Sequence, residues 1–281
     1  GDVYKRQEYG SGRTCAGFAD FVQMSGCKGK IHIINSRFEG AQDDPINVHG
    51  THLKVIAYEP GNKIVVRFMH PQSYGFEAFF PGDEVEFTEI HSLQCLHKAS
   101  VLKVERINDY DCKLTLNSSV PSILPQQEVV IENITWTPEV EIRNNYFART
   151  PTRGILVTTR RKVIIENNVF YRTPMSAIAI SNDARSWYES GPVHDLTIRN
   201  NHFIECGSPV INIAPENNRP NGTVHKGIRI ENNRFTLKDK QAIYARWTDN
   251  IRISGNYFDG IYPISTKESV LLEHCTNVEN E

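Results

Sequence analysis

The hexapeptide Ile142-Arg-Asn-Asn-Tyr-Phe147 returns along the chain and decides the fold. Four later copies keep its first Ile, fourth Asn and last Phe: Ile165-Glu-Asn-Asn-Val-Phe170, Ile198-Arg-Asn-Asn-His-Phe203, Ile230-Glu-Asn-Asn-Arg-Phe235 and Ile253-Ser-Gly-Asn-Tyr-Phe258. From one Phe to the next the steps are 23, 33, 32 and 23 residues. Ile33-Ile-Asn-Ser-Arg-Phe38 is an earlier copy with one substitution. A fixed period of this length indicates a repeat architecture.

A second pair of apolar residues follows each Phe, at the eighth and tenth positions after it. Alternation with period two over short segments predicts strands. Short strands separated by polar corners, with no helical stretch, are typical of a right-handed parallel β-helix, so we expect an all-β protein. Coils in such a fold stack roughly 4.8 Å apart. The repeated Asn and Phe residues should therefore form structural ladders. The pairs are Ile46 and Val48, Ile155 and Val157, Ile178 and Ile180, Ile211 and Ile213, and Ile243 and Ala245.

One coil carries a long insertion. A distance of 109 residues separates Phe38 from Phe147, which is 86 more than one 23-residue coil. Within it, longer alternating runs are separated by turn-forming sequences such as Glu59-Pro-Gly-Asn62 and Asn108-Asp-Tyr-Asp111. We therefore predict a small antiparallel β-barrel-like domain at residues 52–137, inserted between β-helix coils at residues 8–51 and 138–281.

The composition excludes several classes of protein. The 281 residues include 31 Lys and Arg against 33 Asp and Glu, a formal net charge of −2, and the basic residues are scattered. A nucleic-acid partner is therefore not expected. The longest apolar stretches, such as 177–180, are far shorter than the roughly 20 residues that cross a bilayer, so no membrane span is expected.

The cysteines and the first residues carry weaker signals. The cysteines are widely spaced without a Cys-x-x-Cys pair, which supports neither a zinc ribbon nor a disulfide framework, although one or two bridges remain open. They are Cys15, Cys27, Cys95, Cys112, Cys206 and Cys275. The chain opens on Gly1 rather than Met, and residues 1–7 resemble translated adapter sequence, so we expect a fragment that lacks N-terminal coils.

Three carboxylates are predicted to share one wall of the β-helix. Asp43 and Asp44 precede Pro45, and counting back one 23-residue period from Asp43 gives Asp20. Stacking places Asp20 about 5 Å from Asp43 and further from Asp44. Their mutual repulsion should raise the pKa of at least one carboxyl group. An ordinary Asp-Asp-Pro turn, a calcium site and a carboxylate pair for glycosidic cleavage all remain open.

Other polar residues are placed around this wall by the same reasoning. Arg153 occupies the position of Asp44 in the next coil, where it can bind a sugar hydroxyl or neutralise the acids. His49 lies just beyond the strand, as a substrate-binding residue or a structural hydrogen-bonding group. No metal or cofactor is expected.

Two loops are candidates to complete the site. The extra residues 181–188 offer amide, carboxylate and aromatic groups that sugars use, and Asn182, Asp183 and Trp187 are the candidate contacts. In the inserted domain, residues 70–77 are expected to lean over the cleft and to contribute Glu77 as an acid.

A longer segment carries a family resemblance. Glu39-Gly-Ala-Gln-Asp-Asp-Pro-Ile-Asn-Val-His-Gly-Thr-His52, followed by a β-rich insertion with Tyr74-Gly-Phe76 and the Asn-Asn-x-Phe coils, resembles glycoside hydrolase family 110. The similarity runs from about Gly12 to the end, and only the N-terminal coils of the family are missing. The arrangement is also similar to that of β-helical pectin hydrolases, which use an Asp pair plus one Asp from a neighbouring coil.

The resemblance implies a function. Members of this family are exo-acting α-1,3-galactosidases that release terminal galactose with inversion, including from blood-group-B-type and linear glycans. It implies that Asp20, Asp43 and Asp44 form the catalytic cluster, that a glycan is the partner, and that the protein is secreted to the periplasm or cell surface. Two other functions remain open: a hydrolase or lyase acting on acidic polysaccharide, and a non-catalytic β-helix surface protein that binds calcium.

Overall fold

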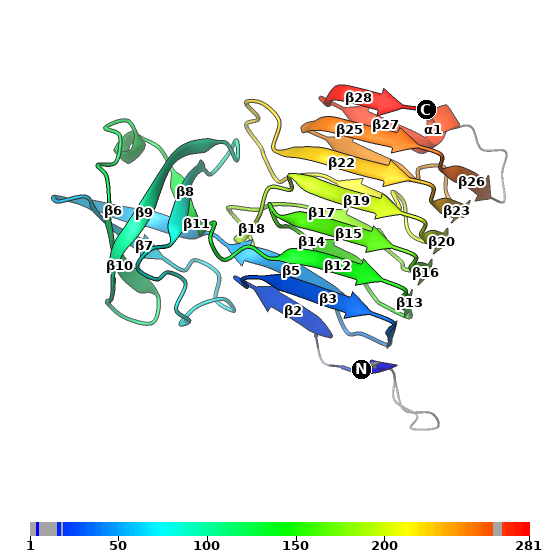
Figure 1. Cartoon of the computed structure of the whole chain (residues 1–281), viewed down its shortest axis with the longest axis horizontal. Helices are drawn as coiled ribbons and strands as arrows, with labels where there is room; N and C mark the ends of the chain where they lie inside the picture. The colour runs from blue at the N-terminus through cyan, green and yellow to red at the C-terminus, as the bar shows by residue number, and fades with distance from the viewer. Residues whose placement is uncertain (1–3, 6–15, 18, 261–265) are drawn as a thin grey trace.

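The computed structural model describes residues 4–5, 16–17, 19–260 and 266–281, and these are almost entirely β-structure. Figure 1 shows a stack of coils with a separate barrel beside it. The prediction of an all-β parallel β-helix with an inserted antiparallel barrel is confirmed. Within the described residues one short helix, α1 (Thr266–Ser269), and one 3-10 turn, η1 (Leu124–Gln126), interrupt the strands.

Three parallel sheets form the walls of the β-helix. The first contains β3 (Lys30–Ile34), β12 (Glu139–Arg143), β15 (Lys162–Glu166), β19 (Asp195–Arg199), β22 (His225–Glu231), β25 (Thr248–Ser254) and β28 (Thr276–Asn280). The second contains β1 (Tyr4–Lys5), β4 (Arg37–Glu39), β13 (Tyr146–Ala148), β16 (Val169–Tyr171), β20 (His202–Ile204), β23 (Arg234–Leu237) and β26 (Tyr257–Gly260). The third contains β2 (Val22–Ser25), β5 (Ile46–Thr51), β14 (Ile155–Val157), β17 (Ile178–Ile180), β21 (Ile211–Ile213), β24 (Ile243–Arg246) and β27 (Val270–Glu273).

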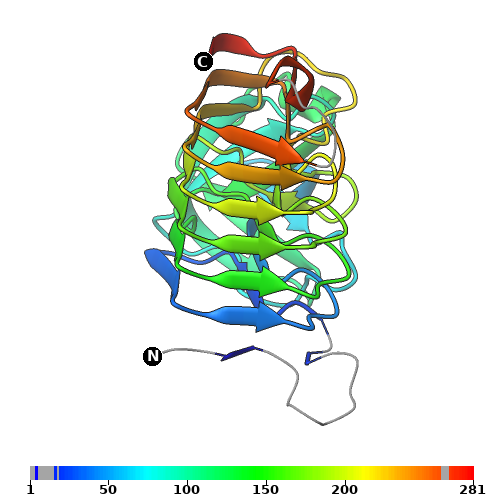
Figure 2. The same cartoon turned by 90° about the vertical axis from the view of Figure 1, so that its right-hand side faces the viewer.

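Equal positions of the repeat lie on top of one another, as Figure 2 shows for the stacked coils. Phe147 pairs with Phe170 and Phe170 with Phe203, so the rings form a buried stack with centroids 4.8 to 5.1 Å apart. Inward Ile residues fill the rest of the core. Close packing of this apolar column removes it from water and supplies the main driving force for stacking.

The two Asn residues of the repeat have different tasks. The first occupies the left-handed region, with φ of 56° at Asn144 and 55° at Asn167, and in the last copy Gly255 takes this place with φ of 64°. The second is buried, and each of its amides donates to the next: Asn145 Nδ2 to Asn168 Oδ1 and Asn168 Nδ2 to Asn201 Oδ1, both at 3.0 Å. The predicted ladder is therefore a structural element of the corner.

The insertion forms a closed antiparallel barrel with its own core, which includes Leu53, Phe87 and Leu114. Its strands are β6 (Leu53–Glu59), β7 (Lys63–Arg67), β8 (Glu84–Glu89), β9 (Cys95–Arg106), β10 (Asp111–Leu116) and β11 (Val129–Asn133). The chain leaves the β-helix through β5 and returns to it at β12, and residues 52–137 stay the predicted limits of the insertion.

A buried ion cluster joins the barrel to the β-helix. Arg160 follows β14, and its guanidinium donates to Glu86 of β8 at 3.1 Å and to Glu132 of β11. Ser190 Oγ donates to Glu132 as well, at 3.0 Å. Because unpaired charges in this environment are costly, the cluster favours one orientation of the barrel over others.

The remaining composition-based expectations concern thiols and membrane spans. Cys27, Cys95, Cys112, Cys206 and Cys275 are free thiols, and Cys15 lies outside the described residues. Among the described residues, none of the helices is both long and apolar enough to cross a bilayer.

The ladder predicts a specific loss of stability. Asn168→Ala removes the acceptor of the Asn145 N–H and of the Asn145 side-chain amide, and the side-chain donor to the Ile142 carbonyl, so it should lower the free energy of unfolding by about 2–4 kcal/mol. Urea unfolding measures this. Asn212→Ala, on the outer face of β21, is the control and should cost less than about 0.5 kcal/mol. Equal losses for the two variants would contradict the role of the ladder.

Candidate active site

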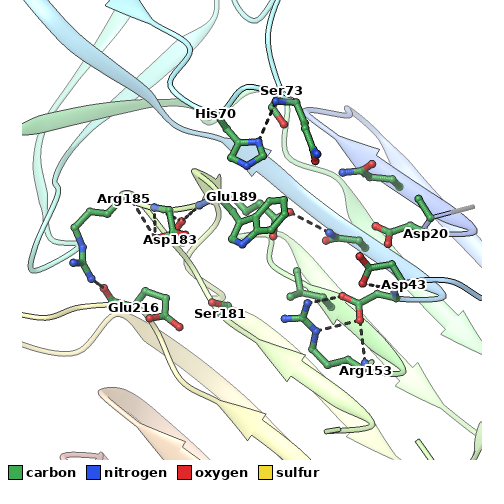
Figure 3. Close-up of a pocket in the computed structure, with 18 residues that line it drawn as sticks. Asp20, Asp43, His70, Ser73, Arg153, Ser181, Asp183, Arg185, Glu189 and Glu216 are labelled. Atoms are coloured by element: carbon green, nitrogen blue, oxygen red, sulfur yellow. Dashed lines mark hydrogen bonds and ion pairs between the residues drawn. The ribbon is translucent and has the colours of Figure 1, made fainter. Parts of the chain in front are cut away.

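A cavity of about 610 Å³ lies where β2, β5 and β14 face the barrel. Its floor is the outer face of this sheet, and two loops cover it: residues 181–188 of the β-helix and residues 70–73 of the barrel (Figure 3). The polar and charged side chains that line it are Asp20, Gln23, Asp43, Asp44, Asn47, His70, Gln72, Ser73, Arg153, Ser181, Asp183, Arg185, Ser186, Glu189 and Glu216. The three predicted acids therefore do share one cavity.

Asp44 is held in place from the neighbouring coil. Its side chain is only 2% exposed, and Oδ1 accepts hydrogen bonds from Thr152 Oγ1 at 2.8 Å and from the backbone N–H of Arg153 at 3.0 Å. The Arg153 guanidinium forms an ion pair with Oδ2 at 2.9 Å. Because Ile46 pairs with Ile155, Arg153 lies in the position of Asp44, as predicted.

The register of Asp20 differs from the prediction. Val22 pairs with Ile46, so this coil is 24 residues long rather than 23. Asp20 lies two residues before Val22, and Asp44 lies two residues before Ile46. Extending the pairing of Val22 with Ile46 back by two residues therefore puts Asp20 beside Asp44 and not beside Asp43. The placement opposite Asp43 was wrong because the first coil contains one residue more than the repeat.

Asp20 has the unusual electrostatic environment that the crowding of acids predicts. Burial, followed by the charges of Asp44 and Asp43, raises the pKa of Asp20 from 3.8 to about 6, and a hydrogen bond from Asn47 only partly opposes this. Asp43 is exposed, and its Oδ1 accepts the N–H of Asp44 at 2.9 Å. In Figure 3 the carboxyl groups of Asp20 and Asp43 point into the same part of the cavity. The cavity thus holds carboxyl groups in different environments, with Asp43 exposed and Asp44 buried in an ion pair.

The loop of residues 181–188 is organised by its own polar residues. Asp183 lines the cavity, and its carboxylate accepts backbone N–H groups from residues 185, 186, 187 and 188, which anchors the loop. Asn182 is buried, and its Oδ1 accepts the N–H of Gly191 at 3.2 Å, so the structure does not bring it to the cavity wall. Trp187 is 55% exposed, lines the cavity and packs against His70 with ring centroids 4.5 Å apart.

Two further candidates lie outside the cavity. His49 is buried behind the wall, with Nδ1 2.6 Å from the Gly50 carbonyl oxygen and Nε2 3.5 Å from Glu189 Oε1. Glu77 lines a separate pocket of about 370 Å³ within the barrel. Its loop does reach the cavity, but only through residues 70–73, because Phe76 packs back onto Phe68 at 4.8 Å and turns the chain toward the barrel.

The sequence analysis missed Gln23, Asn47 and Glu189. Gln23 and Asn47 alternate with inward apolar residues of β2 and β5. Because successive side chains of a strand point to opposite faces, this alternation was enough to predict that both lie on the outer face. Glu189 belongs to β18 (Glu189–Ser190), which pairs antiparallel with β5. No local sequence signal shows where a long loop returns to a sheet, so this pairing was not predictable.

Among residues 19–260 and the other described segments, no three His, Cys, Asp or Glu side chains converge as a metal site would require. Arg153 occupies both oxygens of Asp44, which removes a carboxylate that a calcium ion would need.

The chain is similar in sequence to proteins named alpha-1,3-galactosidases. A family described as "GLAA-B beta-barrel domain II" matches residues 63–130, which lie in the barrel. The chain is 52% identical over 274 residues to alpha-1,3-galactosidase A of Bacteroides thetaiotaomicron, covering 96% of this chain and 48% of that protein. It is 35% identical over 291 residues to alpha-1,3-galactosidase B of Bacteroides fragilis, covering 93% and 48% respectively. The chain thus spans about half the length of these curated relatives.

Solved structures match as well. The tailspike protein gp49 of Pseudomonas phage LKA1 aligns with 90% of this chain and 46% of its own, with a TM-score of 0.31 and 12% sequence identity.

The raised pKa of Asp20 predicts a pH dependence of stability. Between pH 3.8 and about 6 the folded protein keeps a proton that the unfolded chain has lost, so the contribution of Asp20 to stability falls as the pH rises through this window. Asp20→Asn removes this loss. The thermal midpoint of Asp20→Asn minus that of the unmodified protein should therefore increase as the pH is raised from 4 to 7.

The matched control is Asp239→Asn, in the exposed turn between β23 and β24. Its difference from the unmodified protein should stay constant over the same range. A constant difference for Asp20→Asn as well would show that Asp20 titrates normally.

Proposed function

We propose that the protein is a glycoside hydrolase of family 110 that releases terminal α-1,3-linked galactose from glycans. The observation that supports it most directly is the set of three carboxyl groups, in different environments, within one covered cavity of glycan size. The names of the relatives point to the same reaction and the same linkage.

In this proposal Asp20 is the general acid and Asp43 the general base of an inverting reaction. Asp43 removes a proton from a water molecule as that water attacks the anomeric carbon. The bond from this carbon to the leaving oxygen breaks on the opposite face, and the oxygen receives the proton of Asp20. The high pKa of Asp20 suits the donor, since it remains protonated in mildly acidic solution.

Asp44 has a supporting task in this proposal. Held by Arg153 and Thr152, it keeps a fixed negative charge beside Asp20. That charge favours the protonated form of Asp20 before reaction. It also stabilises the positive charge that develops on the sugar ring in the transition state.

The charge of the cavity favours a neutral substrate. Six carboxyl groups line it, at Asp20, Asp43, Asp44, Asp183, Glu189 and Glu216, against the guanidinium groups of Arg153 and Arg185. An acidic polysaccharide would be repelled by this surface. The exposed face of Trp187 offers an apolar platform for a sugar ring, which a neutral galactoside can use.

The proposal also covers the substrates and the location of the protein. Blood-group-B-type and linear α-1,3-galactosyl glycans are the proposed substrates, and the periplasm or the cell surface is the proposed location. Both rest on the resemblance of residues 39–52 and of the repeated coils to family 110.

Leaving-group dependence separates the two catalytic roles. Asp43→Asn should lower the rate by about a thousandfold or more on both a Galα1-3Gal disaccharide and a 4-nitrophenyl galactoside, because every substrate needs an activated water. Asp20→Asn should lower the disaccharide rate similarly but affect the nitrophenyl substrate much less, because nitrophenolate leaves without protonation. Initial rates measure both.

The control for these variants is Glu205→Gln, which removes only a surface ion pair with Arg172 and should keep the full rate. Asp44→Asn should also lose at least about a thousandfold. Near-normal rates for the Asp43 and Asp44 variants would show that the site assignment is wrong.

A further inference from the structure

One buried amide in the cavity wall has an acceptor without a partner. Asn47 is only 6% exposed although it points to the outer face of β5, and it lines the cavity. Its Nδ2 donates to Glu189 Oε1 at 3.2 Å, and the amide also donates to Asp20. With both amide hydrogens used, Oδ1 is left buried and without a hydrogen bond. A group of this kind costs stability unless another molecule satisfies it.

The orientation of this amide is determined by its neighbours. Exchanging oxygen and nitrogen would set Oδ1 against the carboxylates of Glu189 and Asp20, where acceptors would repel each other. The two orientations of the amide are therefore not equivalent, and the favoured one leaves Oδ1 as the free acceptor.

Glu189 supplies a second acceptor next to it. Asn47 and His49 both approach Oε1, and within the part of the chain that the structure describes Oε2 has no hydrogen-bond partner. The backbone of Glu189 is fixed by the pairing of β18 with β5, where Glu189 lies opposite Thr51. The loop before it is anchored by Asp183. Two acceptors are thus held rigidly side by side before any ligand binds.

We infer that Asn47 and Glu189 form a subsite that binds two ring hydroxyls of the terminal galactose, with Asn47 Oδ1 and Glu189 Oε2 each accepting one hydroxyl proton. The inference rests on the proposed function, and it names two specificity-determining residues for that reaction. A neutral pyranose satisfies both acceptors through hydroxyl donors, whereas a carboxylated sugar would be repelled by Glu189. The buried acceptor of Asn47 also rejects a sugar that lacks the matching hydroxyl, because Oδ1 is then left unpaired.

The test is the binding of free galactose and its 2-, 3-, 4- and 6-deoxy analogues, measured by titration calorimetry at pH 7. Galactose is the reaction product, so binding is measured without turnover. The unmodified protein should bind at least one ring-deoxy analogue about ten- to a hundredfold more weakly than galactose. In Glu189→Gln or Asn47→Leu the ratio of the two affinities should fall below about threefold. The comparison is a double-mutant cycle in which one change removes the acceptor from the protein and the other removes the hydroxyl from the sugar.

Two matched controls separate recognition from folding. Asn212→Leu makes the same change on the same outer face two coils beyond Leu156, and Glu205→Gln makes the same change at a surface ion pair. Both should keep the affinity and the discrimination. Leu is also the residue that pairs with Asn47 in the next coil, at Leu156, so Asn47→Leu should fold.

Each outcome supports or overturns the inference. Unchanged discrimination in both variants overturns it, as does uniform weakening of all the sugars, which would assign Asn47 and Glu189 a purely structural role. If galactose binds with the predicted discrimination but no galactoside is hydrolysed, the subsite stands and the proposed reaction fails. If hydrolysis proceeds and the variants bind like the unmodified protein, only the subsite fails. Absence of galactose binding overturns the subsite, and the proposed reaction is then judged by hydrolysis alone.

Discussion

The in-register hydrogen bonding between successive coils is the constraint on which the rest of the structure depends. It places equal positions of the repeat on top of one another, so that Phe170 stacks on Phe147 and Asn168 bonds to Asn145. These inward and corner contacts hold the register, because a slip of one residue would expose apolar side chains and leave buried amides unpaired. The same register brings Arg153 to Asp44, although 109 residues separate them.

The inserted barrel forms one side of the cavity. A β-helix wall alone presents an open row of polar side chains, and the insertion places residues 70–73 above that row. The Arg160 cluster with Glu86 and Glu132 holds the barrel in this orientation. Contact between His70 and Trp187 then closes the space between the two parts of the chain. The insertion therefore adds a second side to this row, so that the acids lie in a cavity lined from both parts of the chain.

Much of this arrangement could be predicted from the sequence, because a repeat converts spacing along the chain into position in space. The fold and the pairing of Asp44 with Arg153 follow from period and alternation. Asp20 was placed one residue out of register because a single coil departs from the common length. Glu189 and the turning of Glu77 away from the cavity depend on how long loops fold back, which local patterns do not encode. The buried acceptor of Asn47 is visible only when its neighbours are known.

The central claim is that these carboxyl groups hydrolyse a terminal α-1,3-galactoside by direct attack of water. The most direct measurement is the configuration of the galactose first released from a Galα1-3Gal disaccharide, followed by proton NMR before mutarotation. Inversion at the anomeric carbon would make β-galactose appear first, with the α-anomer growing in later. Release of α-galactose first, or no release of galactose at all, would contradict it.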